Sequence, residues 1–99
     1  MLAAFSIAPV GAGESVSSEV AEVVRLVRES GLANETNAMF TNVEGEWDEV
    51  MALLKTCTEK VAERSGRVSL VVKIDYRRGV TGALRSKVEA VERHLRAGA

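Results

Sequence analysis

The chain of 99 residues predicts one α+β domain, a ferredoxin-like βαββαβ sandwich with an additional C-terminal helix. Apolar residues recur at every second position in some segments and at every third or fourth position in others. These segments follow one another in the order strand, helix, strand, strand, helix, strand, helix. The length is enough for one hydrophobic core and too short for two, so we expect residues 1–99 to form a single domain.

The first strand and the first helix are expected in the N-terminal third of the chain. Residues 2–10 form an apolar run with bulky side chains on one face and small ones, including Ser6, on the other. A loop is expected over residues 11–15. Ser17 or the serine after it then caps a helix whose valines recur at helical spacing, and Gly31 ends this helix.

The middle of the chain predicts a β-hairpin. Residues 33–38 and 41–45 are predicted as two strands with a two-residue connection, which pairs Asn37 with Asn42. The connection lacks the Asn-Gly signal of the commonest tight hairpins. In this register one face of the hairpin carries only amides and carboxylates: Glu35, Asn37, Asn42 and Glu44.

The C-terminal half predicts a helix, a strand and a final helix. The second helix is expected over residues 46–64 and is closed by Gly66, and the last strand is expected over residues 67–77. Residues 78–82 then turn the chain into the final helix. The apolar stripe of this final helix is narrow and consists of Leu84, Val88, Val91 and Leu95.

In a ferredoxin-like sandwich, two helices cover one face of a four-stranded antiparallel sheet. The other face is bare unless a ligand or a second subunit covers it. Strand alternation assigns small, apolar and polar side chains to this open face: Ala4, Ser6, Ala8, Glu35, Asn37, Asn42, Glu44, Val71, Lys73 and Asp75. A sheet face with so many hydrogen-bonding groups is either wet or occupied by a ligand that hydrogen-bonds.

Composition excludes several classes of protein. The chain has 13 basic and 14 acidic residues, without the basic excess that is typical of nucleic-acid-binding domains. Cys57 and His94 are the only cysteine and histidine, so we expect no internal disulfide and no zinc cluster. A lone cysteine is typical of a reducing cytoplasm. The apolar run over residues 2–10 is too short for a membrane span and is predicted as a strand rather than a signal peptide.

Short stretches along nearly the whole chain form a characteristic set, of which residues 44–49 are the strongest part. The set consists of Ser6-Ile7-Ala8-Pro9-Val10-Gly11, Ser15-Val16-Ser17, Glu29-Ser30-Gly31-Leu32, Met39-Phe40-Thr41, Glu44-Gly45-Glu46-Trp47-Asp48-Glu49-Val50-Met51 and Lys73-Ile74-Asp75-Tyr76-Arg77. Together and in this order, these stretches resemble the small prokaryotic thiamine-binding protein family.

The resemblance implies a fold, an assembly and a ligand. Members of this family are ferredoxin-like domains that dimerise through their sheets and commonly form tetramers. They bind thiamine or its hydroxymethylpyrimidine part without known chemistry. The resemblance places the ligand on the strands around Ser6, residues 37–41 and Asp75. This chain has Phe40 where many members carry a glycine, and the larger side chain would narrow or reshape the pocket.

The side chains at these positions suit an aminopyrimidine, which presents a donor amine between acceptor ring nitrogens. Asn37 both donates and accepts, and a carboxylate beside a hydroxyl offers the same combination. Met39 or Phe40 offers an apolar surface for the flat ring. The candidate ligand-binding residues are Ser6, Asn37, Met39, Thr41, Glu44 and Asp75, and we expect no catalytic residue, no metal and no cofactor.

Alternatives stay open for the residues and for the function. Asn37 also fits a solvated or hairpin-stabilising amide, and Asp75 and Lys73 also fit a pair on one strand face that bridges to a partner sheet. Glu44 also fits a role at the dipole of the helix that directly follows it, or a subunit contact. Cys57 lacks a neighbouring base, which counts against a catalytic cysteine. The resemblance, with the side chains at these positions, implies a cytoplasmic, non-catalytic protein that binds the vitamin and carries, buffers or senses it. The rivals are a small ferredoxin-like enzyme that uses the same cleft and a purely structural or regulatory oligomer.

Overall fold

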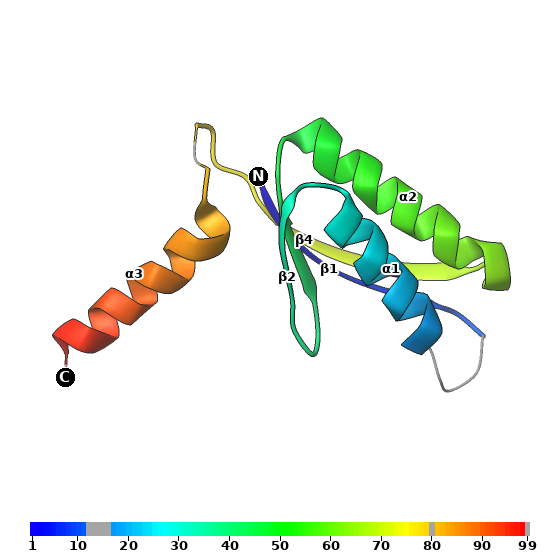
Figure 1. Ribbon diagram of the computed structural model, residues 1–99, viewed down its shortest axis with the longest axis horizontal. Helices are drawn as coiled ribbons and strands as arrows, with labels where there is room; N and C mark the ends of the chain where they lie inside the picture. The colour runs from blue at the N-terminus through cyan, green and yellow to red at the C-terminus, as the bar shows by residue number, and fades with distance from the viewer. Residues whose placement is uncertain (12–16, 80, 99) are drawn as a thin grey trace.

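The computed structural model describes residues 1–11, 17–79 and 81–98, and it confirms the predicted order of strands and helices (Figure 1). Most of the loop predicted over residues 11–15 and Val80 of the predicted turn lie outside the described residues. The elements are β1 (Leu2–Pro9), α1 (Ser17–Glu29), β2 (Ala33–Thr36), β3 (Thr41–Glu44), α2 (Trp47–Ser65), β4 (Val68–Asp75) and α3 (Ala83–Ala97).

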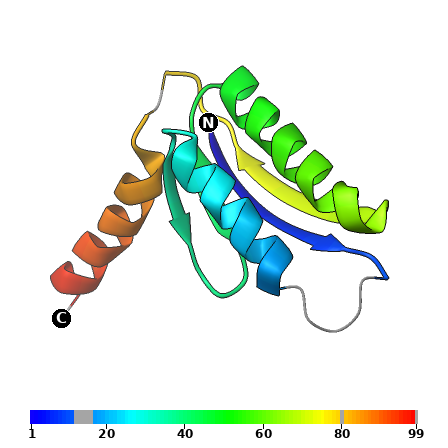
Figure 2. The ribbon, with the colours of Figure 1, turned by 45° about the vertical axis from the view of Figure 1, so that its right-hand side comes forward.

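The four strands form one antiparallel sheet in the order β2-β3-β1-β4. β1 pairs with β4 from Leu2 to Pro9 and with β3 from Leu2 to Phe5. Helices α1 and α2 lie side by side on one face of the sheet, whereas α3 lies on the other side and points away from it (Figures 1 and 2). This is the arrangement of a ferredoxin-like α+β sandwich with an additional C-terminal helix.

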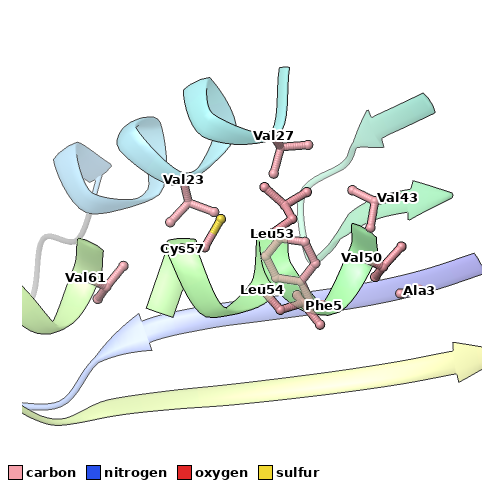
Figure 3. Close-up of a cluster of buried hydrophobic side chains, with 10 residues drawn as sticks. All are labelled: Ala3, Phe5, Val23, Val27, Val43, Val50, Leu53, Leu54, Cys57 and Val61. Atoms are coloured by element: carbon pink, nitrogen blue, oxygen red, sulfur yellow. The ribbon is translucent and has the colours of Figure 1, made fainter. Parts of the chain in front are cut away.

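The hydrophobic core fills the space between the sheet and helices α1 and α2 (Figure 3). β1 alternates as predicted, because Ala3 and Phe5 are buried in the core while Ala4 and Ser6 face the other side. Burial raises the pKa of the Cys57 thiol to about 11, so this side chain behaves as a small hydrophobe. The core consists of Ala3, Phe5, Val23, Val27, Val43, Val50, Leu53, Leu54, Cys57 and Val61.

Helix α2 begins and ends within one residue of the predicted bounds. The backbone N–H of Glu46 donates to Oε1 of Glu49 at 3.0 Å, which completes a capping box at the first turn. Gly66 ends the helix with φ of 68°, a left-handed conformation that glycine adopts at the lowest cost. Trp47, in the first turn, is half exposed and meets Tyr76 edge to face, with ring centroids 6.4 Å apart.

The predicted register of the hairpin is wrong by two residues. The structure pairs Glu35 with Asn42 and ends β2 at Thr36, so Asn37 opens a loop over residues 37–40 instead of pairing across it. Oδ1 of Asn37 accepts the N–H groups of Met39 and Phe40, and this geometry replaces the predicted two-residue connection. A shift of two residues preserves the face on which each paired side chain lies, so Glu35, Asn42 and Glu44 keep their predicted face, whereas Asn37 leaves the strand.

Helix α3 differs from the other two helices because none of its residues is buried. Two polar contacts link it to the sheet. The N–H of Ala83 donates to Oε2 of Glu44 at 2.7 Å, and Nζ of Lys87 lies 2.6 Å from Oδ2 of Asp75. The predicted apolar stripe is present but exposed, and Val88, Val91 and Leu95 each keep more than half of their surface accessible.

Candidate functional site

A cavity of about 390 Å³ lies between the open face of the sheet and the first half of α3. Its walls therefore come from elements that are distant in sequence but adjacent in space. The sheet contributes a floor of small, amide and charged side chains: Leu2, Ala4, Glu35, Asn42, Lys73 and Asp75. Asn37 lies at one edge, and α3 contributes Ala83, Leu84, Lys87 and Val88.

Larger hollows occur elsewhere on the surface but hold little of the predicted site. One of about 690 Å³ follows the outer face of α1 and is bounded by that single helix, between Ser17 and Glu29. Another of about 510 Å³ lies at the end of the sheet, beside Trp47 and Tyr76. Asn37 and Asp75 line neither of them, whereas both residues line the cavity under α3. We therefore take the cavity under α3 as the candidate site.

Asn37 uses its two amide groups differently. Oδ1 accepts from the backbone N–H groups of Met39 and Phe40, both at 2.9 Å, and so holds the turn after β2. The Nδ2 amide has no acceptor among the described residues, and the residue lines the cavity. Asn37 therefore combines the structural role and an available hydrogen-bond donor, which sequence reasoning treated as alternatives.

Asp75 lies within a cluster of positive charges. Oδ2 is 2.6 Å from Nζ of Lys87, and Oδ1 is 3.8 Å from Nε of Arg77. Lys73 lies two residues earlier on the same face of β4. The hydrogen bond from Lys87 and the surrounding positive charges hold the pKa of the Asp75 carboxyl below its ordinary value. Asp75 is therefore ionised at neutral pH and is already paired.

Ser6 and Glu44 share the open face but do not line the cavity. Ser6 pairs with Val71, farther along β1 than the Ala4–Lys73 pair at the cavity floor. Glu44 lies beside Leu2 at the near end of the sheet, and its Oε2 accepts from the first N–H of α3. Glu44 therefore holds the start of α3, and not the start of α2, the helix beside which the sequence placed it.

Thr41 and Met39 lie away from the cavity. Thr41 is 7% exposed, on the helix-covered side, and pairs with Phe5. Met39 is 73% exposed in the loop after β2, and Phe40 in the same loop does not line the cavity either. The structure thus brings Asn37 and Asp75 together and separates them from the other four candidate residues.

The cavity also contains residues that sequence reasoning did not select as ligand-binding. Glu35, Asn42 and Lys73 were placed on the open face by strand alternation, and Nδ2 of Asn42 donates to the carbonyl of Glu35 at 3.4 Å. Lys87 was not singled out at all. The sequence did hold a signal for Lys87, because it lies between Leu84 and Val88 of the apolar stripe. A side chain at that position points toward the same surface as the stripe, which here is the cavity.

Other chemistries find little support in the described part of the chain. Cys57 is buried between the sheet and the helices, whereas His94 is exposed on the projecting end of α3. No cluster of three or more His, Cys, Asp or Glu side chains among residues 1–11, 17–79 and 81–98 is placed to hold a metal ion. Within those same residues, every helix is too short or too polar to cross a lipid bilayer.

Comparison with known proteins gives a consistent result. The family described as thiamine-binding protein matches residues 3–92. A UPF0045 protein of Mycobacterium bovis is 53% identical over 96 residues, which cover 96% of this chain and 94% of that protein. A UPF0045 protein of Synechocystis is 36% identical over 90 residues, which cover 90% of this chain and 74% of that protein.

Solved structures share the fold. A hypothetical protein of Methanocaldococcus jannaschii superposes with a TM-score of 0.84 at 34% identity, covering 92% of this chain and 94% of that chain. A putative thiamine biosynthesis/salvage protein of Thermotoga maritima superposes with a TM-score of 0.75 at 22% identity, covering 88% and 96%. At that identity, the second likeness supports the fold alone.

Proposed function

The chain belongs to the thiamine-binding protein family, and we propose that it binds thiamine or the hydroxymethylpyrimidine part of thiamine in the cavity under α3. The observation that carries this proposal is the convergence of Asn37 and Asp75 on that cavity. An amide with an available donor and an ionised carboxylate there complement the two polar parts of thiamine. These parts are the aminopyrimidine ring and the thiazolium cation.

The shape of the cavity supports the proposal. A volume of about 390 Å³ falls within the range of small-molecule sites, which are mostly apolar with a few placed polar groups. Leu2, Leu84 and Val88 supply apolar surface for a flat ring. In this pose the Nδ2 amide of Asn37 donates to a pyrimidine nitrogen, and Asp75 accepts from the amine or attracts the thiazolium.

The proposed role is binding without chemical conversion. The described residues that line the cavity include no cysteine, histidine or hydroxyl side chain, and the ammonium of Lys87 is engaged in the ion pair with Asp75. We propose that the protein carries, buffers or senses the vitamin in the cytoplasm, where Cys57 stays a free thiol.

We also propose that two copies associate through their open sheet faces. Val71 on this face is 55% exposed, and the stripe of α3 projects beyond the sheet with Val91 and Leu95 exposed. A twofold arrangement would cover both apolar surfaces at once, because each copy offers the same patch to the other. An interface of this kind would bury on the order of 1,200 Å² or more. Two such dimers would form the tetramer that the family resemblance implies.

Calorimetric titration with thiamine, hydroxymethylpyrimidine and the isolated thiazole tests the function. We expect thiamine and hydroxymethylpyrimidine to bind and the thiazole alone to give no heat of binding, because the amide of Asn37 hydrogen-bonds to the pyrimidine. Binding of the thiazole with an inert pyrimidine would reverse the assignment of the polar groups. If none of the three binds, the proposal fails in favour of a structural role. Chemical conversion of a ligand during the titration would instead favour the alternative that the protein is a small ferredoxin-like enzyme.

A further inference from the structure

The carboxylate that the proposed site offers to a cation is already occupied from within the chain. Nζ of Lys87, on α3, lies 2.6 Å from one oxygen of Asp75, and Nε of Arg77 lies 3.8 Å from the other. Lys73 is a third cation on the same face of β4. Among the described residues, Asp75 thus faces three positive charges, and Lys73 and Lys87 also line the cavity.

A cationic ligand in this cavity would be repelled by the cations that already surround Asp75. Thiamine carries a permanent positive charge on its thiazolium ring, and a like charge within a few ångströms is unfavourable. The ammonium of Lys87 is the closest of the competing cations. Its side chain is 49% exposed, so the ammonium can exchange Asp75 for water at small cost. Displacement of Lys87 into solvent therefore removes the repulsion and frees the carboxylate.

We propose that Lys87 is a built-in competitor for Asp75, which a cationic ligand has to displace in order to bind. This inference rests on the proposed function, because it concerns the same cavity. Lys87 then sets the selectivity of the site, because it lowers the affinity for thiamine relative to the affinity for the uncharged hydroxymethylpyrimidine. The pyrimidine alone brings no cation and can bind with the Lys87–Asp75 pair intact.

The experiment compares the affinity of thiamine with that of hydroxymethylpyrimidine in the wild-type protein and in a set of variants. Lys87→Met removes the ammonium but keeps the length of the side chain. We expect the ratio of thiamine to hydroxymethylpyrimidine affinity to rise about three- to tenfold, in line with the loss of a partly exposed ion pair and of a like charge. Lys87→Arg restores the charge and should return the ratio to the wild-type value.

The matched control is Arg85→Met, which removes one positive charge from the same helix at a residue that does not line the cavity. The ratio should stay at the wild-type value in this variant. In a protein that already carries Asp75→Asn, Lys87→Met should produce a smaller rise than in the wild-type background. The carboxylate for which the two cations compete is gone there, and only the repulsion between Lys87 and the thiazolium is left to remove. Melting curves verify that each variant is folded.

The outcomes separate this inference from the proposed function. If wild-type protein binds thiamine but the ratio is unchanged or lower in folded Lys87→Met, the competitor role is overturned while the function stands. An equal rise in Arg85→Met would also overturn it, since a general effect of net charge would explain the data. If no protein in the set binds either compound, the function and the inference both fall.

Discussion

Phe5 and Ser6 are neighbours on β1, yet they belong to two faces of the sheet that the protein uses differently. The face under α1 and α2 is closed, with Phe5 only 1% exposed among other apolar side chains. The open face carries Ser6, amides and charged groups that pair with one another or with α3. Stability is thus concentrated on one face, and the other keeps polar groups available for a ligand.

Helix α3 extends the contrast between the two faces. Helices α1 and α2 bury valines, leucines and Cys57 against the sheet, whereas α3 buries no residue and meets the open face through Glu44 and Asp75. A helix anchored by one exposed ion pair and one partly buried hydrogen bond gains little stability from them. This difference shows that α3 contributes little to the core, in line with our proposal that it serves the cavity and the association of copies.

The largest effect is expected on the covered face. Phe5→Ala removes a buried ring and leaves a cavity, so the free energy of unfolding should fall by about 3–5 kcal/mol. The matched control is Ser6→Ala, one residue along the same strand but on the open face, which should change it by less than about 0.5 kcal/mol. Urea unfolding followed by circular dichroism measures both. Similar losses for the two variants would break the contrast between the faces.

The second effect concerns the exposed stripe of α3. Val91→Glu combined with Leu95→Glu places charges where we propose a second copy, which should cost roughly 2–3 kcal/mol of association free energy. Arg93→Glu is the control, because Arg93 lies on the opposite side of the same helix. Light scattering at micromolar concentration should report a mass of one 10.6 kDa chain for the double variant and a multiple of it for the control. Equal masses for the double variant and the control would show that the apolar stripe of α3 is not part of the interface.

The sequence predicted the faces of the sheet more reliably than it predicted the site. Alternation along β1 and β4 depends only on the pleat, so Phe5 and Lys73 were assigned correctly. The register of the hairpin depends on the turn, and there the side chain of Asn37 competes with strand pairing, which periodicity does not reveal. Lys87 was missed because it reaches Asp75 across a turn, and the path of that turn is a tertiary feature.

Thr41 shows the same limit from another direction. Its hydroxyl fits a ligand-binding list by residue type, and the family resemblance places ligand positions around residues 37–41. The structure buries Thr41 beneath the helices, next to Phe5. Residue type alone does not distinguish a polar group in a site from a polar group in a core. The face on which the side chain lies decides between them, and strand alternation along β3 puts Thr41 on the same face as the buried Val43.

The smallest effect is expected at Asn37, where the two roles of one amide can be separated. Asn37→Ala removes the acceptor for the N–H groups of Met39 and Phe40, so the free energy of unfolding should fall by about 1 kcal/mol. It also removes the Nδ2 donor, and the affinity for hydroxymethylpyrimidine should fall about tenfold. Asn37→Asp keeps the Oδ1 acceptor and loses only the donor.

Asn37→Asp should therefore melt near the wild-type temperature and still bind hydroxymethylpyrimidine about tenfold more weakly. Hydroxymethylpyrimidine is the better probe here, because it lacks the thiazolium cation that a new carboxylate would attract. Calorimetric titration beside a melting curve gives both quantities for each variant. Wild-type affinity in Asn37→Asp would assign the amide to the turn alone. A large loss of stability in Asn37→Asp would mean that Nδ2 also supports the fold, so the open face would share in stability after all.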